Sequence, residues 1–310
     1  MPSPSLRRRR LLESLLVLGG AGALPVTSAQ PTNAPQLLTR PIPSSGEALP
    51  VIGLGSWITF NVGNDRMARA ECTEVMRNFF ASGGRMIDSS PMYGSAQDVI
   101  GAAVQQLKPA QLFSADKVWI GSGERGPAQI ESSRRLWRVP KFDLLQVHNL
   151  LAWEEHLPAL FEMKRAGRLR YVGITTSEGR RHGEIVRIMG SQPIDFVQVT
   201  YNVLDREVEQ RILPLARERR IAVIANRPFR QGDLTQTLAR HRLPGWAAEI
   251  GCRSWAQALL KFIVANEAIT CAIPATSSVA HVRENMQAGA GVLPDAALRR
   301  RMIADVEKLA

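Results

Sequence analysis

The segment GRMIDSSPMYGSAQ (residues 84–97) places a carboxylate, Asp88, five positions before a phenol, Tyr93, with turn-forming residues between them. An ammonium group, Lys117, follows 24 residues later, and an imidazole, His148, 31 residues after that. Together these groups could move a proton, because a neighbouring ammonium stabilises a phenolate and lowers the pKa of the phenol. A carboxylate would hold the ammonium in place and keep it charged. Taken singly, each residue could equally be a turn cap, a packing residue, a surface charge or a core histidine.

Short apolar strands alternate with helical patterns after residue 45, which indicates βαβ units and a parallel sheet. The predicted strands are residues 51–57, 85–88, 112–119, 142–148, 170–175, 194–200, 221–225 and 270–274. Eight such units over about 260 residues predict an α/β fold of the (β/α)₈, or TIM, barrel type. No GxGxxG follows the first strand, which argues against an open dinucleotide-binding sheet. In such a barrel Asp88, Tyr93, Lys117 and His148 all follow or end strands, so they converge on one face.

Helices are predicted between and after these strands. One ends at Gly83 and Gly84, and others cover residues 95–107 and 153–165. Asp205 is predicted to cap a helix that contains Val208, Ile212 and Leu215 and is interrupted by Pro214. A last helix is predicted from about Asp295.

Over residues 40–310 the chain resembles the aldo-keto reductase superfamily. The matching segments are VIGLGSW, GRMIDSSPMYGSAQDVIG, SADKVW, FDLLQVHN, GRLRYVGITTS, FVQVTYNVLDRE and AIPATSSVAHVRENMQA. The resemblance implies a catalytic tetrad of Asp88, Tyr93, Lys117 and His148. It also implies reduction of an aldehyde or ketone to an alcohol, with a hydride from NAD(P)H and Tyr93 as general acid, while neutral His148 hydrogen-bonds the substrate oxygen.

The same resemblance implies a nicotinamide cofactor, NADPH by preference with NADH possible. Its expected contacts are Ser56, Trp57, Thr175, Thr176, Gln198, Arg227, Thr276, Ser277, Glu284 and Asn285. The family's Ser-Asn pair is Thr175-Thr176 here, and an aromatic position after the seventh strand is Asn226. These departures keep an alternative open, namely a catalytically weak nicotinamide-binding sensor or a partner-docking subunit on the same fold.

The substrate is expected to be a small-molecule carbonyl compound whose identity the sequence does not give. Candidate pocket residues are Trp57, Phe60, Asn149 and Trp153. Only two helices are expected after the eighth strand, so a long C-terminal lid is not predicted. A hydrolase would need paired carboxylates or a metal cluster at the strand ends, and neither pattern is present in the sequence.

Residues 1–29 have a basic start, a short apolar run and small residues before Ala29, which is typical of a cleaved export signal. Arg8-Arg9-Arg10-Leu11-Leu12 resembles a twin-arginine signal, although the general secretion route or an uncleaved anchor would also fit. We therefore expect the twin-arginine machinery as a transit partner, a periplasmic or exported protein, and no stable membrane span after processing. Residues 30–45 are expected to form a Pro-, Ser- and Thr-rich linker, and residues 46–310 the barrel.

The 310 residues are 45% hydrophobic and 22% charged, as is usual for a globular protein. The formal charge of +11 could suggest nucleic-acid binding, but the basic residues form no stripe interleaved with aromatics. No nucleic-acid partner is therefore expected. The three cysteines are far apart and form no metal-ligand spacing, so we expect core packing and no metal.

Overall fold

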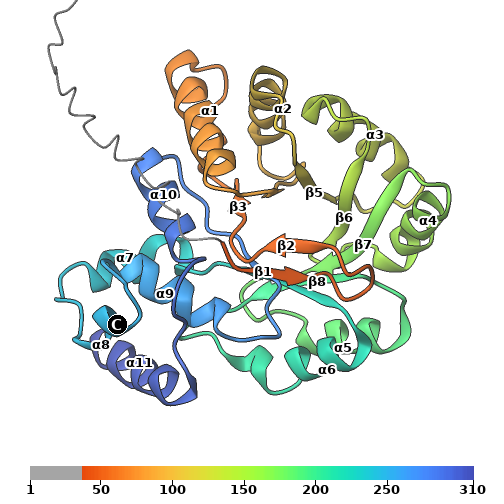
Figure 1. Cartoon of the computed structure of the whole chain (residues 1–310). Helices are drawn as coiled ribbons and strands as arrows, with labels where there is room; N and C mark the ends of the chain where they lie inside the picture. Colours follow the sequence, from red (N-terminus) through yellow and green to blue (C-terminus); the bar gives the residue numbers. More distant parts are fainter. Residues whose placement is uncertain (1–36) are drawn as a thin grey trace, which may run out of the picture. The chain divides into compact units, whose positions relative to one another are not determined.

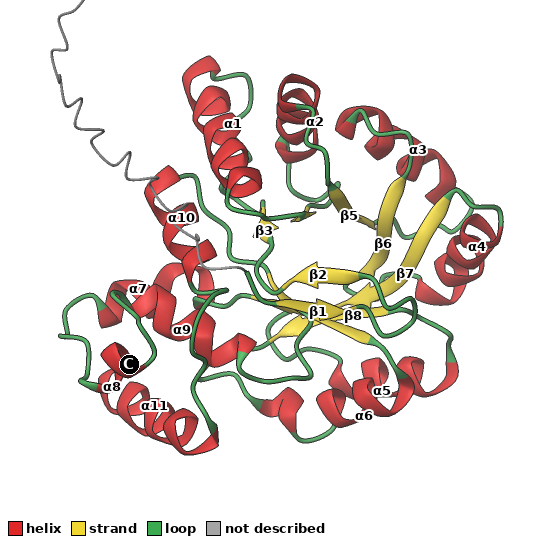
Figure 2. Ribbon diagram, viewed as in Figure 1, coloured by secondary structure: helices red, strands yellow, loops and turns green. Residues whose placement is uncertain are grey.

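The structure, a computed structural model, describes residues 37–310. In this range eight parallel strands form one sheet in which each strand pairs with the next along the chain (Figure 2). The strands are β3 (Leu54–Gly55), β4 (Met86–Asp88), β5 (Phe113–Val118), β6 (Phe142–His148), β7 (Leu169–Thr175), β8 (Phe196–Thr200), β9 (Ala222–Asn226) and β10 (Cys271–Ala272). The predicted (β/α)₈ barrel is confirmed.

The barrel closes where β3 meets β10. The N–H groups of Gly53 and Gly55 donate to the carbonyl oxygens of Ala272 (2.8 Å) and Pro274 (3.0 Å). Glycine is needed at position 55, because a Cβ there would lie 2.8 Å from the carbonyl oxygen of Ile273. The two strands at this seam are shorter than the predicted 51–57 and 270–274. Closure leaves the eight-stranded sheet without a free edge, and its parallel strands end at a single rim.

Helices follow the strands and surround the barrel (Figure 1). Helix α1 begins after Asp65, whose carboxylate accepts hydrogen bonds from the next turn, and ends just before Gly83, which has φ +85°. The predicted start of the last helix at about Asp295 is confirmed, and Asp295 caps it by accepting from the Leu298 N–H. The helices are α1 (Arg66–Ala81), α2 (Ala96–Leu107), α3 (Gly126–Trp137), α4 (Trp153–Arg165), α5 (His182–Ser191), α6 (Ile212–Arg219), α7 (Asp233–Leu238), α8 (Trp246–Glu249), α9 (Trp255–Val264), α10 (Val279–Gln287) and α11 (Ala296–Leu309), with 3₁₀ turns η1 (Glu207–Glu209) and η2 (Arg230–Gly232).

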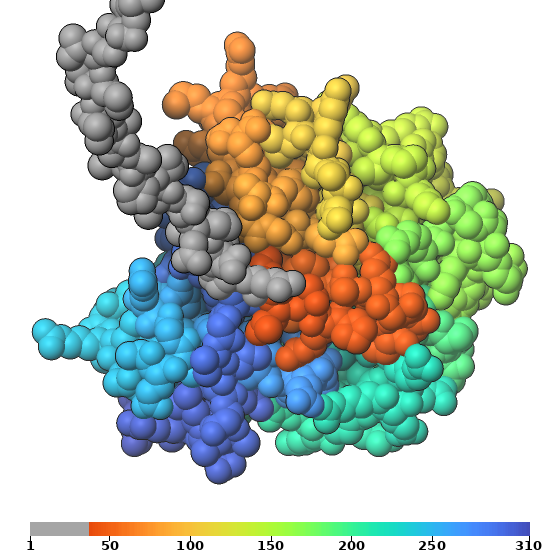
Figure 3. Space-filling view, in the orientation of Figure 1, coloured from red at the N-terminus to blue at the C-terminus, as the bar shows by residue number. Residues whose placement is uncertain are grey.

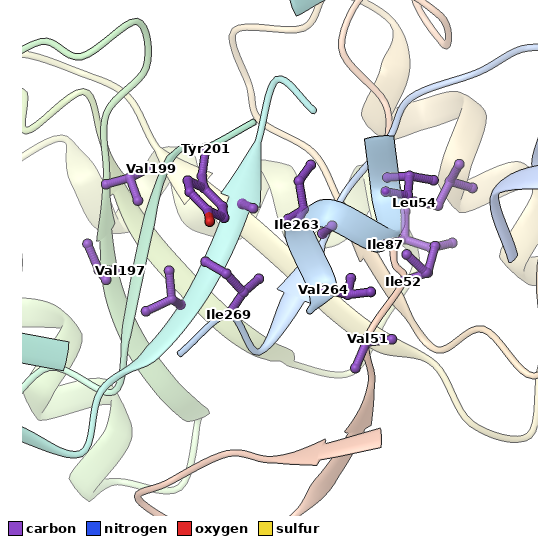
Figure 4. Packing of buried hydrophobic residues seen from close by; sticks show 14 of the residues in the cluster. Val51, Ile52, Leu54, Ile87, Val197, Val199, Tyr201, Ile263, Val264 and Ile269 are labelled. Carbon is purple, nitrogen blue, oxygen red and sulfur yellow. The ribbon is translucent and has the colours of Figure 1, made fainter. Parts of the chain in front are cut away.

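Alternation along each strand separates two hydrophobic clusters. In β6, Leu144 belongs to the cluster inside the barrel, whereas Leu145 and Val147 belong to the cluster between the sheet and the helices. Figure 4 shows part of the outer cluster, with Ile263 of α9 among the strand residues. Because side chains alternate with a period of two, Gln146 and His148 share the inner face with Leu144. The inner face is therefore apolar toward the amino ends of the strands and polar toward their carboxyl ends.

A hairpin closes the amino-terminal end of the barrel. Strands β1 (Thr39–Pro41) and β2 (Ala48–Pro50) pair antiparallel, and the hairpin appears red-orange in Figure 3. Ile42 and Leu49 are fully buried in the inner cluster. Residues 39–45 are thus part of the fold, which corrects the predicted linker boundary at residue 45. The composition was misleading because Pro and Ser also suit a tight hairpin whose apolar side chains are few.

The hairpin is held by parts of the chain that are far apart in sequence. The Arg40 guanidinium donates to the carbonyl oxygens of Val264, Asn266 and Ile269, at and after the end of α9. Glu47 pairs with Arg85 (2.8 Å), next to β4, and with Arg170 of β7. Further hydrogen bonds join Ser45 to Tyr171 (2.8 Å) and the Leu38 N–H to the carbonyl of Gly289 (2.7 Å).

The prediction that a helix begins directly after Asp205 is wrong. Residues 207–209 form only a 3₁₀ turn, and α6 begins separately at Ile212. Pro214 falls in the first turn of α6, where a proline without an N–H is tolerated. Asp205 instead pairs with Arg230, whose Nε lies 2.7 Å from Oδ2.

Within residues 37–310 no helix is long and apolar enough to cross a membrane. In the same range no group of three or more His, Cys, Asp or Glu could hold a metal ion. Cys72, Cys252 and Cys271 are free and buried, so the predicted core packing of the cysteines is confirmed.

Asp116 is a buried carboxyl group on the outer face of β5. Its Oδ2 accepts a hydrogen bond from the Gln97 amide of α2 (2.7 Å), while its Oδ1 has no partner. Gln97 also donates to Ser133 of α3 (2.9 Å). Burial raises the pKa of Asp116 to about 7, against an opposing effect of the neighbouring Lys117. The carboxyl group therefore ionises in the folded protein at a much higher pH than in the unfolded chain.

We expect Asp116→Asn to stabilise the protein at pH 8 and to have little effect at pH 4. Between the unfolded pKa near 4 and the folded pKa of about 7, the folded state binds more protons, so the wild type loses stability as pH rises. This difference between the folded and unfolded pKa values lowers the free energy of unfolding of the wild type by at most about 4 kcal/mol above pH 7, since each pKa unit corresponds to about 1.4 kcal/mol. Urea unfolding at several pH values measures it. A difference that is constant with pH would contradict the assignment.

Candidate active site

Four titratable side chains meet at the carboxyl end of the barrel, as predicted. Asp88 and His148 are the last residues of β4 and β6, Lys117 lies near the end of β5, and Tyr93 follows in the turn after β4. The strands are hydrogen-bonded neighbours in the order β4-β5-β6. The carboxyl end of the barrel therefore carries all four groups, three on strands and Tyr93 on the turn after β4.

Asp88 and Lys117 form a buried ion pair. Lys117 Nζ donates to Asp88 Oδ2 (2.6 Å) and to the carbonyl oxygen of Ser89 (2.7 Å), and the two side chains are 0% and 3% exposed. The other carboxylate oxygen, Oδ1, accepts from Gln198 (2.9 Å) and Gln146 (3.3 Å). Both oxygens of Asp88 are thus satisfied, as burial of a charge requires.

Lys117 lies beneath Tyr93, with Nζ 5.2 Å from the centre of the phenol ring. Burial lowers the pKa of Lys117, but Asp88 and Tyr93 raise it, and the net pKa lies above the usual value. Burial raises the pKa of Tyr93, Lys117 lowers it, and the net pKa also lies above the usual value. The predicted effect of Lys117 on the phenol has the expected sign but does not outweigh burial. Tyr93 is therefore protonated at neutral pH and available as an acid.

His148 is neutral over the physiological range. Burial, followed by the nearby Lys117 charge, lowers its pKa to about 3. Its ring meets Tyr93 edge-on, with centroids 5.7 Å apart, and lies 6.5 Å from Trp119. Nδ1 is 2.7 Å from the hydroxyl of Ser90. A neutral imidazole beside a phenol can hydrogen-bond a substrate oxygen without adding a charge.

A pocket of about 850 Å³ opens above these groups. Its walls include Asp88, Tyr93 and His148, whereas Lys117 lies underneath, out of the lining. Most of the predicted binding residues line it, namely Ser56, Trp57, Asn149, Thr175, Gln198, Arg227, Thr276, Ser277, Glu284 and Asn285.

Three predicted binding residues lie outside the pocket lining. Phe60 is fully buried in the outer cluster, so the prediction that it lines the substrate pocket was wrong. The same prediction for Trp153 was also wrong. Trp153 is the first residue of α4, packs into the same cluster, and donates a hydrogen bond from its indole N–H to Glu184 (2.8 Å). Thr176 is 2% exposed and does not reach the pocket, and its hydroxyl has no hydrogen-bond partner.

The departures from the family pattern form one hydrogen-bonded group. Thr175 donates to Gln198 Oε1 (3.1 Å), and the Asn226 amide donates to the carbonyl oxygen of Thr176 (2.9 Å). Asn226 Oδ1 accepts from Thr200 (2.8 Å). The polar atoms of Asn226 are thus engaged with the rim, and the side chain still lines the pocket. A rigid amide takes the place of the expected aromatic ring.

Several pocket residues were not predicted from the sequence. Glu178 and Arg180 follow β7, and Arg253 precedes α9. Glu178 also pairs with Arg227 across the pocket rim (2.7 Å). Their position just after a strand was the available signal for Glu178 and Arg180. The position of Arg253 depends on tertiary packing. Three arginines, together with the amino end of α10, give this side of the pocket the chemistry of an anion site.

Comparison with known proteins is consistent with this geometry. The model of the aldo/keto reductase family matches residues 51–301. Methylglyoxal reductase YeaE of Escherichia coli is 28% identical over 249 residues, which cover 78% of this chain and 86% of that protein. The NADH-specific methylglyoxal reductase of the same species is 24% identical, covering 67% and 72%.

Solved structures share the fold. The holo form of an aldo-keto reductase from Bacillus halodurans aligns with a TM-score of 0.72 and 21% identity, covering 89% of this chain and 98% of that one. An aldo-keto reductase from Klebsiella pneumoniae in complex with NADPH aligns with a TM-score of 0.69 and 23% identity, covering 85% and 92%. Since the family model spans most of the sequence, the chain belongs to the aldo/keto reductase family, whose members are NAD(P)H oxidoreductases.

Proposed function

We propose that the protein reduces an aldehyde or ketone to an alcohol with NADPH, with Tyr93 as general acid. The observation that supports this most is the buried Asp88–Lys117 pair beneath the Tyr93 ring. A charged lysine under a protonated phenol favours release of the phenol proton to an acceptor in the pocket. Family membership supports the reaction class.

The chain's own residues would act on the substrate oxygen. Tyr93 donates a proton to it, and Lys117 stabilises the phenolate that remains. Neutral His148 donates a hydrogen bond that strengthens as negative charge develops on that oxygen. Asp88 holds Lys117 in place and keeps it charged. Bound NADPH supplies the reducing equivalent.

The pocket suits an anionic dinucleotide. Arg180, Arg227 and Arg253 line the side formed by loops that follow β7, β9 and α8, and can hold phosphates. Thr175 and Gln198 offer polar groups next to Asp88. Thr276 and Ser277 would contact the phosphates, and Glu284 and Asn285 the adenine. We propose NADPH as the preferred coenzyme and NADH as a weaker one.

We expect Tyr93→Phe to reduce turnover of aldehydes by at least about 100-fold, because a positioned acid contributes on the order of 10²–10⁴. Binding of NADPH, followed by fluorescence titration, should change less than about threefold. The measurement is loss of NADPH absorbance with a panel of aldehydes. Near-normal turnover by the variant would contradict the role of Tyr93. If the wild type binds NADPH but turns over no aldehyde, the sensor or docking-subunit alternative replaces the enzyme.

The substrate side of the pocket is apolar. Ile58 and Met92, which follow β3 and β4, line the pocket and are 61% and 43% exposed. Trp119, which follows β5, is 39% exposed, and its ring lies 6.5 Å from that of His148. Exposed apolar groups that gather at a mouth indicate an apolar ligand. Apart from Asp88, whose carboxylate is paired with Lys117, the charged pocket residues come from the loops after β7 and beyond. We therefore propose an uncharged carbonyl substrate with an apolar body.

Phenylglyoxal and methylglyoxal test this substrate class, because they differ only in a phenyl or methyl group beside the same dicarbonyl. We expect kcat/KM to be at least about tenfold higher for phenylglyoxal, since covering a phenyl ring contributes more than about 1.4 kcal/mol. Trp119→Ala should reduce the ratio. Leu136→Ala is the matched control, because Leu136 has the same 39% exposure but lies in α3 beside Gly101 of α2, whereas the Trp119 ring lies 6.5 Å from that of His148. If wild type and Trp119→Ala have the same ratio of kcat/KM for phenylglyoxal to kcat/KM for methylglyoxal, the proposed apolar contact with the substrate is refuted.

We also propose that residues 1–29 are a twin-arginine export signal and that the barrel works in the periplasm or outside the cell. The support is the sequence pattern around Arg8–Leu12 and Ala29, which lies outside the described residues. Cell fractionation with an antibody to the barrel tests this, and retention of the full-length protein in the cytoplasm would contradict it.

A further inference from the structure

The residues between Asp88 and Tyr93 form a hydrogen-bonded turn. The Tyr93 N–H donates to the carbonyl oxygen of Ser90 (3.0 Å), which defines a β-turn with Pro91 at its second position. The Ser90 hydroxyl oxygen also accepts from the Met92 N–H (3.2 Å). This is the pattern in which a serine side chain copies a backbone turn. The turn therefore fixes both the Ser90 side chain and the start of the Tyr93 backbone.

The Ser90 hydroxyl can donate to only one described group. Ser90 is 0% exposed, so its O–H has no access to bulk water. Met92 already occupies a lone pair of its oxygen, and the remaining contact is His148 Nδ1 at 2.7 Å. A hydroxyl whose lone pair accepts from an N–H places its proton on its other neighbour. Ser90 therefore donates to Nδ1.

The opposite arrangement is worse on two counts. If Nδ1 carried the proton, the Ser90 oxygen would accept from both Met92 and His148, and its own buried hydroxyl would lack an acceptor. An unsatisfied buried polar group is unfavourable. The lone pair on Nε2 would also face the pocket and repel the oxygen of a bound carbonyl. The tautomer is thus set by the turn.

We propose that Ser90 is a positioning residue that holds neutral His148 with its proton on Nε2, ready to donate to the substrate oxygen. The same turn presents the acid Tyr93 and, through Ser90, orients the second hydrogen-bond donor of the site. Lys117 and Asp88 are the charged groups nearest to this turn, and their pairing leaves no carboxylate free to accept from Nδ1. The catalytic consequence rests on the proposed carbonyl reduction, whereas the tautomer itself does not.

The tautomer can be read without turnover. In protein labelled with ¹⁵N-histidine, a protonated and an unprotonated ring nitrogen give well-separated signals, and His148→Gln assigns one of the five histidines. We expect an unprotonated Nδ1 and a protonated Nε2 in the wild type at neutral pH. A protonated Nδ1 would overturn the proposal whether or not the protein reduces carbonyls.

The role of the Ser90 hydroxyl is tested by two matched substitutions in the same turn. Ser90→Ala removes the donor to Nδ1, whereas Ser89→Ala removes a buried hydroxyl that has no hydrogen-bond partner. We expect Ser90→Ala to shift the His148 ring signals and to lower kcat about tenfold with KM little changed. This loss of kcat is smaller than the ~10²–10³-fold loss on deleting a hydrogen-bond donor to the substrate oxygen, because the His148 imidazole remains in Ser90→Ala. Ser89→Ala should leave the ring signals unchanged.

Ser90→Thr keeps the hydroxyl and should restore the wild-type ring signals together with most of kcat. If Ser90→Ala retains the wild-type signals, or if Ser89→Ala shifts them as strongly, Ser90 does not set the tautomer. If the signals shift as expected but the wild type reduces no carbonyl, only the proposed function fails. The combined readouts therefore separate the two failures.

Discussion

The ion pair between Asp88 and Lys117 is the constraint on which the rest of the site depends. Two charges so deeply buried are tolerated only when every lone pair and proton has a partner, and removing one member of such a pair typically costs about 3–5 kcal/mol. The carboxylate meets this requirement with donors from three further strands: Lys117 of β5, Gln146 of β6 and Gln198 of β8. Barrel closure brings these strand ends to a single point. Burial, reinforced by the Lys117 charge held there, depresses the pKa of His148, and the same charge opposes the effect of burial on the pKa of Tyr93.

The loops at the pocket rim differ in polarity according to their order along the chain: those after the first strands are apolar and those after the later strands are charged. Loops after β3, β4 and β5 contribute apolar side chains such as Ile58, Met92 and Trp119. Loops that follow β7 and β9 contribute Glu178 and Arg227, which form an ion pair at the pocket rim. A protonated phenol and a neutral imidazole lie near the apolar part, so the proposed proton transfer would take place where no net charge has to be desolvated. The cationic groups lie where a phosphate-bearing coenzyme would need them.

The barrel and the convergence of its four titratable groups were predictable because they depend on local rules. Alternating strands and helices give the fold, and strand-end position places titratable groups on one rim. The errors come from features that only tertiary packing decides. Phe60 and Trp153 follow strands, yet their rings turn into the helix layer, and nothing in their spacing distinguishes an inward from an outward direction. Asp205 has the residue type of a cap, but a nearby arginine, Arg230, offers a stronger partner than the helix end. The role of Ser90 was hidden because a serine in a turn normally needs no other explanation.

The hairpin of β1 and β2 has a consequence for how the chain folds. It is the first element in the described part of the chain, and its partners are spread from Arg85 through Tyr171 and Asn266 to Gly289, so it depends on residues that come much later in the sequence. Contacts of such sequence separation carry a large loop-closure cost and form slowly. A ribosome-bound or truncated chain that lacks α9 and the residues after it cannot form the hydrogen bonds of the Arg40 guanidinium. The hairpin can therefore complete its contacts at the amino-terminal end of the barrel only after the chain has been synthesised as far as Gly289.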